Sequence, residues 1–157
     1  MFCFFLTSSI VALRVGRYNF PVEQLTHNGT NYKAELEHEI LHFNFLAAAE
    51  RPEGCFEEEP TVAVSVTKGD LEVCISLGIL EAVNYSLIQD APSRQPKGIK
   101  VVYPGDRYQD ITFEILCNRV EKRSVRRTKP FEYLITWQHP AGCPRLSSTK
   151  SSKFSQI

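Results

Sequence analysis

The sequence has no excess of charge of either sign, because 18 lysine and arginine residues stand against 18 aspartate and glutamate residues. A chain without net charge has no overall field that would attract DNA or an anionic membrane, so a charged partner must be bound by a local patch. The length of 157 residues suits one domain. A domain of this size buries roughly two-thirds of the surface that its unfolded chain exposes.

The opening segment, M-F-C-F-F-L-T-S-S-I-V-A-L, is too short to span a bilayer. It resembles the hydrophobic region of a secretory signal, but it has no basic residues before that region and no small-x-small cleavage site. Residues 1–16 are therefore interpreted as a signal peptide, a first strand or the end of a fragment.

The sequence lacks a C-x-x-C pair that would indicate a zinc or redox site, although it contains five cysteines. If a cleaved leader removes Cys3, an even number of cysteines remains, at positions 55, 74, 117 and 143. Two disulfides in an exported protein are the simplest interpretation, and four buried free thiols in a cytosolic protein are the alternative. Asn28 and Asn84 each begin an N-x-S/T glycosylation triplet, which also fits export.

Past residue 60 the sequence has the alternation and the turns of a β protein. Val62, Val64 and Val66 alternate with smaller or polar residues, and K-G-D and P-G-D turns follow. Alternating residues also share one face in two later strands, at 111, 113, 115 and 117 and at 131, 133, 135 and 137. We predict an all-β fold, an antiparallel flattened barrel or sandwich of two sheets. Residues 145–157, rich in serine and lysine, are predicted to be a disordered tail.

The segment H-E-I-L-H, from His38 to His42, has the spacing of a zinc peptidase motif. On a helix both imidazoles could bind one zinc ion while the glutamate polarises a water molecule. Residues 32–50 contain good helix formers, but residues 39–45 also alternate as a strand would, and propensity alone does not decide. In a strand the two histidines would lie about 13 Å apart and could not share a metal ion. The peptidase hypothesis therefore depends on a helix.

Three later segments carry a resemblance to a known family: I-K-V-V-Y-P-G-D-R-Y, I-T-F-E-I-L-C-N-R and F-E-Y-L-I-T-W-Q-H-P-A-G-C-P. They resemble the C-terminal half of a mannose 6-phosphate receptor homology (MRH) domain, in which a Y-x-G-G-D turn precedes a strand ending in cysteine. Upstream, R-Y-N-F-P-V-E-Q-L is similar to the opening segment of that family. The resemblance covers residues 17–144 and is strongest to repeats of the cation-independent receptor, which also binds insulin-like growth factor II.

The resemblance implies a disulfide between Cys117 and Cys143, and Cys55 with Cys74 is then the remaining pair. A further bridge of the family has lost both partners, since Phe131 occupies one position and no cysteine lies between Asp106 and Ile111.

The resemblance also implies where a sugar would bind, because relatives use Gln, Arg, Glu and Tyr to contact mannose. Tyr133 matches the tyrosine position, whereas Val66 or Ile75 stands at the glutamine position and cannot form a side-chain hydrogen bond. The hydroxyl groups of a sugar need directional partners, and each one left unpaired costs about 1–3 kcal/mol.

The two remaining sugar-binding positions match poorly. Asp110 or Gln109 stands at the arginine position, with Arg107 displaced nearby. Glu121 is the candidate glutamate, although Arg123 occupies the expected spacing. The candidate carbohydrate-binding residues are thus Tyr133, Arg107 and Glu121, in a degenerate site. The alternative interpretation makes Tyr133 a core residue beside Trp137.

The run N-R-V-E-K-R-S-V-R-R-T-K holds six lysine or arginine residues between positions 119 and 129. We predict a solvated hairpin loop here, and the alternative is that the run binds a phosphate or an acidic partner. The run contains no aromatic residue for base stacking, which argues against RNA binding.

Together these features predict a non-catalytic binding module, without cofactor or metal, in the lumen of the secretory pathway (Golgi, endosome or lysosome) or outside the cell. By resemblance, its partner would be a glycoprotein or a protein such as a growth factor, in lysosomal-enzyme or glycoprotein trafficking, and it would meet a membrane only through the rest of a receptor. A functional mannose or mannose 6-phosphate lectin is the alternative, and an H-E-x-x-H zinc peptidase is a remote one.

Overall fold

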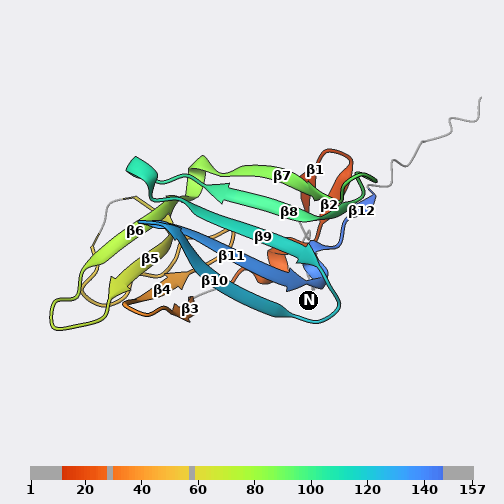
Figure 1. Ribbon diagram of the computed structural model, residues 1–157. Helices are drawn as coiled ribbons and strands as arrows, with labels where there is room; N and C mark the ends of the chain where they lie inside the picture. Colours follow the sequence, from red (N-terminus) through yellow and green to blue (C-terminus); the bar gives the residue numbers. More distant parts are fainter. Residues whose placement is uncertain (1–11, 28–29, 57–58, 147–157) are drawn as a thin grey trace, which may run out of the picture.

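Strands dominate the computed structural model of the protein, which describes residues 12–27, 30–56 and 59–146 (Figure 1). Three sheets form within these residues, and short 3-10 helices connect some of the strands. In the view of Figure 1 a four-stranded sheet lies toward one end, a five-stranded sheet crosses the molecule, and a small three-stranded sheet lies at the other end. The prediction of an all-β fold is confirmed.

The four-stranded sheet is antiparallel and follows chain order, with strands β3 (Tyr32–Glu35), β4 (Glu39–Phe43), β5 (Thr61–Thr67) and β6 (Cys74–Ile79). In β4 the buried residues Glu39, Leu41 and Phe43 alternate with half-buried ones. Residues 32–50 therefore form β3, β4 and irregular chain instead of a helix, because burial of one face of β4 outweighs local propensity.

The five-stranded sheet has the order β10-β11-β9-β8-β7. Its strands are β7 (Asn84–Gln89), β8 (Pro96–Tyr103), β9 (Ile111–Cys117), β10 (Lys122–Lys129) and β11 (Glu132–His139). Strand β11 folds back from β10 and inserts between β10 and β9, so β9 and β11 run parallel. The expectation of antiparallel pairing throughout was wrong at this pair, because alternation of residues within a strand carries no information on strand order.

The basic run forms strand β10 at the edge of this sheet, so the prediction of a hairpin loop there was wrong. Most residues of β10 are exposed. An edge strand with charged side chains lacks the hydrophobic alternation by which strands are recognised in a sequence, and such charges discourage pairing with other chains.

The three-stranded sheet joins the two ends of the described chain. Strand β2 (Tyr18–Phe20) pairs with β1 (Leu13–Val15) on one side and with β12 (Arg145–Leu146) on the other. A leader or fragment end was expected over residues 1–16 and a disordered tail over residues 145–157, of which residues 1–11 and 147–157 lie outside the described residues. The tail prediction was wrong for Arg145 and Leu146, because these two residues pair with β2 as a strand, and Leu13–Val15 forms a first strand. The domain limits of 17 and 144 stay a prediction.

Four short 3-10 helices complete the described elements: η1 (Val22–Leu25), η2 (Leu80–Ala82), η3 (Asp106–Tyr108) and η4 (Pro140–Gly142). An added Cβ at Gly142 would lie 2.7 Å from the carbonyl carbon of Leu116 and 2.8 Å from the carbonyl oxygen of Ile115. Only glycine therefore allows η4 to lie against β9.

The hydrophobic core lies between the two larger sheets and is rich in aromatic rings. The ring of Phe113 in β9 lies with its centroid 6.0 Å from that of Phe43, 5.0 Å from that of Phe45 and 5.9 Å from that of Tyr103. All four residues have no exposed surface. Such tilted and edge-on contacts add to the free energy gained by burying the rings.

Both predicted disulfides are present: Cys117–Cys143, which the resemblance implied, and Cys55–Cys74, which was the remaining pair. The first joins the loop before β5 to the start of β6. The second joins the end of β9 to the residue that follows η4.

We predict that the double substitution Cys117→Ser/Cys143→Ser lowers the free energy of unfolding by about 3 kcal/mol, measured by urea unfolding. The physical reason is the extra conformational freedom of an unfolded chain whose two cysteines, 26 residues apart, are no longer linked. The double substitution Cys55→Ser/Cys74→Ser is the matched comparison, with a separation of 19 residues and a similar expected loss. Free thiols at positions 117 and 143 in secreted protein, found by non-reducing peptide mapping, would contradict this pairing.

Candidate ligand-binding site

Tyr133, which matches the sugar-binding tyrosine of the family, points into the interior and is only 2% exposed. Its hydroxyl donates a hydrogen bond of 2.6 Å to Oε2 of Glu39 in β4. The hydroxyl of Ser65 in β5 donates to the same oxygen. On the other side of the carboxylate, Oε1 lies 3.8 Å from Nη1 of Arg127 in β10. Four strands thus meet at one buried carboxyl group.

The alternation of two strands explains this meeting. In β11, residues 133, 135 and 137 face the core, and in β4 residues 39, 41 and 43 do so. Glu39 is the first residue of its strand, so its carboxylate enters the interior at the margin of the apolar core. A buried carboxylate is costly unless it is hydrogen-bonded and paired, and Tyr133, Ser65 and Arg127 supply these partners.

Burial raises the pKa of Tyr133 from the ordinary 10.0 to about 12, and the hydrogen bond to Glu39 acts in the same direction. The phenol therefore stays protonated at neutral pH and donates a hydrogen bond to Glu39. The hydroxyl that would complete a sugar pocket is engaged within the protein.

Glu121 lies just before β10 and accepts a hydrogen bond of 3.1 Å from the indole nitrogen of Trp137. Trp137 is four residues from Tyr133 along β11, which corresponds to about 13 Å in a strand. The guanidinium of Arg123 lies 4.6 Å from the ring centroid of Tyr32 and 5.0 Å from that of Trp137. Glu121 and Arg123 thus cover Trp137.

Arg107 lies in η3, where its side chain is exposed and its backbone has a φ of 51°. No hydrogen bond or ion pair within the described residues joins Arg107 or Glu121 to Tyr133. The structure does not bring the three candidates into one set of contacts, and their part in sugar binding stays a prediction.

The positions that stand in for the sugar-binding glutamine and arginine have structural partners instead. Ile75, one of the two candidates for the glutamine position beside Val66, packs against the core cluster. Oδ1 of Asp110 accepts a hydrogen bond of 2.9 Å from the backbone nitrogen of Gly105, and the backbone oxygen of Asp110 accepts one of 3.1 Å from the nitrogen of Tyr133. Asp110 therefore fixes the turn that enters β9.

Glu39 is the residue that sequence reasoning missed. It was considered only as the glutamate of the zinc motif. The strand alternation at residues 41, 43 and 45, extended two residues toward the N-terminus, would have placed Glu39 on the buried face.

The H-E-I-L-H segment lacks the helix that a zinc peptidase needs. His38 precedes β4 and His42 lies within it, on the face opposite Leu41 and Phe43. In this extended geometry one zinc ion cannot bind both imidazoles. Burial and the nearby Lys33 lower the pKa of His42. Within the described residues no group of three His, Cys, Asp or Glu side chains is placed to hold a metal ion.

Of the two glycosylation triplets, one can be placed. Asn84 is the exposed first residue of β7, and its side-chain amide donates a hydrogen bond of 3.3 Å to the carbonyl oxygen of Ala82. Asn28 lies outside the described residues. Use of Asn84 as an acceptor stays a prediction.

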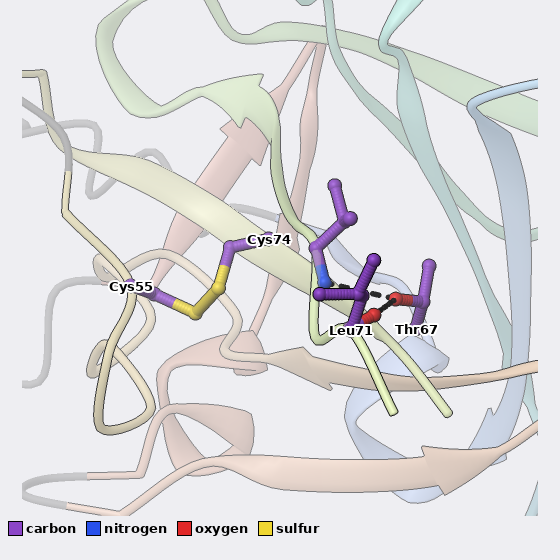
Figure 2. Close-up of a disulfide and its surroundings, with 5 residues drawn as sticks. Cys55, Thr67, Leu71 and Cys74 are labelled. Carbon is purple, nitrogen blue, oxygen red and sulfur yellow. Dashed lines mark hydrogen bonds between the residues drawn. A yellow bond between two sulfur atoms is a disulfide. The ribbon is translucent and has the colours of Figure 1, made fainter. Parts of the chain in front are cut away.

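The hairpin tip, residues 67–73, joins β5 to β6 and carries exposed apolar side chains. Figure 2 shows Thr67 and Leu71 of the tip near the Cys55–Cys74 disulfide. Leu71 is 84% exposed and Val73 is 51% exposed. Thr67 holds the tip together, because its hydroxyl donates to the carbonyl oxygen of Leu71 at 3.2 Å and accepts from the nitrogen of Val73 at 2.9 Å. The Cys55–Cys74 disulfide lies beside the tip, and Phe56, next to Cys55, is also exposed.

We predict that Tyr133→Phe lowers the free energy of unfolding by about 1–3 kcal/mol, because it removes a buried donor from the Glu39 carboxylate. Urea unfolding at pH 7 measures the loss. Tyr85→Phe, at a partly exposed tyrosine, is the matched control and should stay within about 0.5 kcal/mol of wild type.

The pH dependence supplies an independent check on the Tyr133 bond. Since the pKa of Tyr133 is raised on folding, its contribution is fully present below pH 10 and is lost as the pH rises through about 12. The stability difference between wild type and Tyr133→Phe should therefore shrink over this range. A difference that is independent of pH, or no loss at pH 7, would contradict the bond.

No helix in the described part of the chain is both long and apolar enough to cross a membrane.

Comparisons with family models and with curated proteins give no match. Among solved structures, domain 11 of chicken IGF2R matches with a TM-score of 0.54 over 80% of this chain and 84% of that one, at 14% sequence identity. At this identity the match concerns the fold. It agrees with the resemblance seen in the sequence, and the two disulfides fit a lumenal or extracellular location. The chain therefore has the fold of an MRH domain.

Proposed function

We propose that the chain is a non-catalytic, protein-binding MRH-type module of the secretory lumen or the cell exterior, with no mannose site of its own. The observation that carries this proposal is the hydrogen bond from the Tyr133 hydroxyl to Glu39 inside the protein. A mannose ligand would have to replace that bond and leave the carboxylate short of a donor.

The remaining positions add to the cost of binding mannose. Ile75, which with Val66 is a candidate for the glutamine position, packs against the core, and Asp110, which with Gln109 is a candidate for the arginine position, already accepts from a backbone nitrogen. Each unpaired sugar hydroxyl costs about 1–3 kcal/mol, so two missing partners remove most of the binding energy of a small polar ligand. An anionic Asp110 at the arginine position would in addition repel a phosphate group.

The hairpin tip supports a protein ligand. Leu71 and Val73 are exposed although the tip is ordered by Thr67 and anchored beside a disulfide. A fixed apolar surface of this kind gains free energy when a partner protein covers it. The name of the similar structure, IGF2R domain 11, makes a growth-factor-like protein the first ligand class to test. In a receptor, such a module would serve glycoprotein or lysosomal-enzyme transport through the Golgi and endosomes by binding a protein cargo rather than its mannose.

We predict no saturable binding of the domain to arrays of mannose-rich or phosphomannosyl glycans, because the Tyr133 hydroxyl and the neighbouring positions are engaged internally. An MRH domain that binds mannose 6-phosphate serves as the positive control on the same array. Binding that free mannose 6-phosphate competes away and that Tyr133→Phe abolishes would overturn the proposal in favour of the lectin alternative.

We predict that the domain binds insulin-like growth factor II in surface plasmon resonance and that Leu71→Ser/Val73→Ser weakens the interaction about tenfold or more, as loss of two buried apolar contacts would. Val120→Ser, at an apolar residue that is 71% exposed between β9 and β10, is the matched control. Absence of binding would exclude this ligand class, and an equal loss in the control would exclude the hairpin tip as the binding surface.

A further inference from the structure

A cavity of about 380 Å³ lies apart from the Glu39 carboxylate, between the end of β6, the residues that lead into β5 and the turn that contains η3. None of the residues in the Tyr133 network lines it. A volume of this order accommodates a small organic group. The described residues that line it are Glu59, Thr61, Ser76, Gly78, Ile79, Gly105, Asp106 and Gln109.

The charge of this lining has one sign. Two carboxylates, Glu59 and Asp106, contribute to it, and the lining contains no lysine, arginine or histidine. Neither carboxylate forms an ion pair with another described residue. An anionic ligand would be repelled by these two carboxylates, whereas a cation would be attracted. The guanidinium of Arg51 lies nearby and donates a hydrogen bond of 2.8 Å to the backbone oxygen of Glu59.

A second, independent observation comes from Ser76, which is only 9% exposed and lines the cavity. Its neighbours Ile75 and Leu77 face the core, so its own side chain points to the other side of β6. Within the described residues its hydroxyl has no hydrogen-bond partner. The buried side-chain atoms without a partner in the described residues are Oε2 of Glu23 and the hydroxyl of Tyr103, so the Ser76 oxygen keeps some accessible surface, through which it can accept from a donor that enters the cavity.

The walls of the cavity are fixed by close backbone approaches. The nitrogen of Gly78, at a φ of 70°, donates a hydrogen bond of 2.9 Å to the carbonyl oxygen of Gln109. An added Cβ at Gly78 would lie 2.7 Å from Cγ1 of Val62, and one at Gly105 would collide with the Gln109 carbonyl. The side-chain amide of Gln109 is placed to donate to the carbonyl oxygens of Ser76 and Asp106 at 3.2 and 3.3 Å. Both glycines are required for this shape.

We propose that this cavity binds an organic cation, an ammonium or guanidinium head that donates hydrogen bonds to Glu59, Asp106 and Ser76. Charge-assisted bonds to carboxylates are the strong class of hydrogen bond. A metal ion fits less well, because no group of three ligating side chains is present in the described part of the chain. A sugar fits less well because the described lining offers no aromatic ring for its apolar face. The head can belong to a small amine or to a lysine or arginine side chain of a protein, and the inference does not depend on the proposed function above.

The test is an NMR titration of the ¹⁵N-labelled domain with n-butylammonium chloride and with Nα-acetyl-lysine methylamide, and with 1-butanol as the neutral control. Saturable shifts at Gly78, Gly105 and Gln109 with either cation, and none with 1-butanol, are expected. Saturation with both cations indicates a site for free amines, and saturation with the lysine derivative alone indicates a protein side chain.

Substitutions of the two carboxylates test whether the cations bind in this cavity. Glu59→Gln and Asp106→Asn should each weaken cation binding about threefold and the double variant about tenfold, as partly exposed ion pairs do. Glu72→Gln, at an exposed carboxylate in the hairpin tip, is the control and should bind as wild type does. Thermal unfolding of each variant shows that the fold is intact.

The proposal is overturned if neither cation saturates, if 1-butanol shifts the same resonances equally, or if the folded double variant binds as wild type does. Displacement of n-butylammonium by one equivalent of calcium, or by mannose, would also overturn it in favour of a metal or a sugar site.

Discussion

Strand β11 is held on both sides, parallel to β9 and antiparallel to β10, and the rest of the structure depends on this double pairing. This pairing fixes the positions along the sheet at which the side chains of Tyr133 and Trp137 enter the core. Tyr133 then donates a hydrogen bond to Glu39 in the opposite sheet, and Trp137 donates one to Glu121, which precedes β10. A shift of β11 by one residue would turn all its core side chains to the opposite face. The register of one central strand therefore sets the contact between the two sheets.

Burying a carboxyl group at this contact between the two sheets has a free-energy cost. Replacing such a buried, paired group by apolar side chains is often neutral or stabilising in proteins, whereas removing one partner is destabilising. Our hypothesis is that Glu39 specifies how the two sheets align, because its carboxylate must reach Ser65 on the neighbouring strand β5 and Tyr133 on β11 of the facing sheet at the same time. Urea unfolding and NMR of Glu39→Leu would test this, since retention of a single native set of resonances would contradict it.

Part of the architecture could be predicted from the sequence because the physical signals are local. Hydrophobic alternation predicted strands in the regions of β5, β9 and β11. The resemblance predicted the disulfide Cys117–Cys143 and singled out Tyr133. Strand order is not a local property, so the parallel pair β9 and β11 was missed. Strand β10 was missed because its exposed charges hide the alternation. The partner of Tyr133 lies 94 residues away, and only the folded sheets select it.

The small sheet of β1, β2 and β12 has a mechanical consequence. Because β12 pairs with β2, the two described ends of the chain meet at one end of the molecule, and Figure 1 shows the hairpin tip at the other. A pulling force applied at these ends would first act on two residue pairs, Arg145 with Asn19 and Leu146 with Tyr18. Once these separate, the Cys117–Cys143 disulfide transmits the tension from the C-terminal side directly to the end of β9, so residues 118–142 are shielded from extension. Under load the domain would thus yield at its short terminal strand while β10 and β11 keep their pairing.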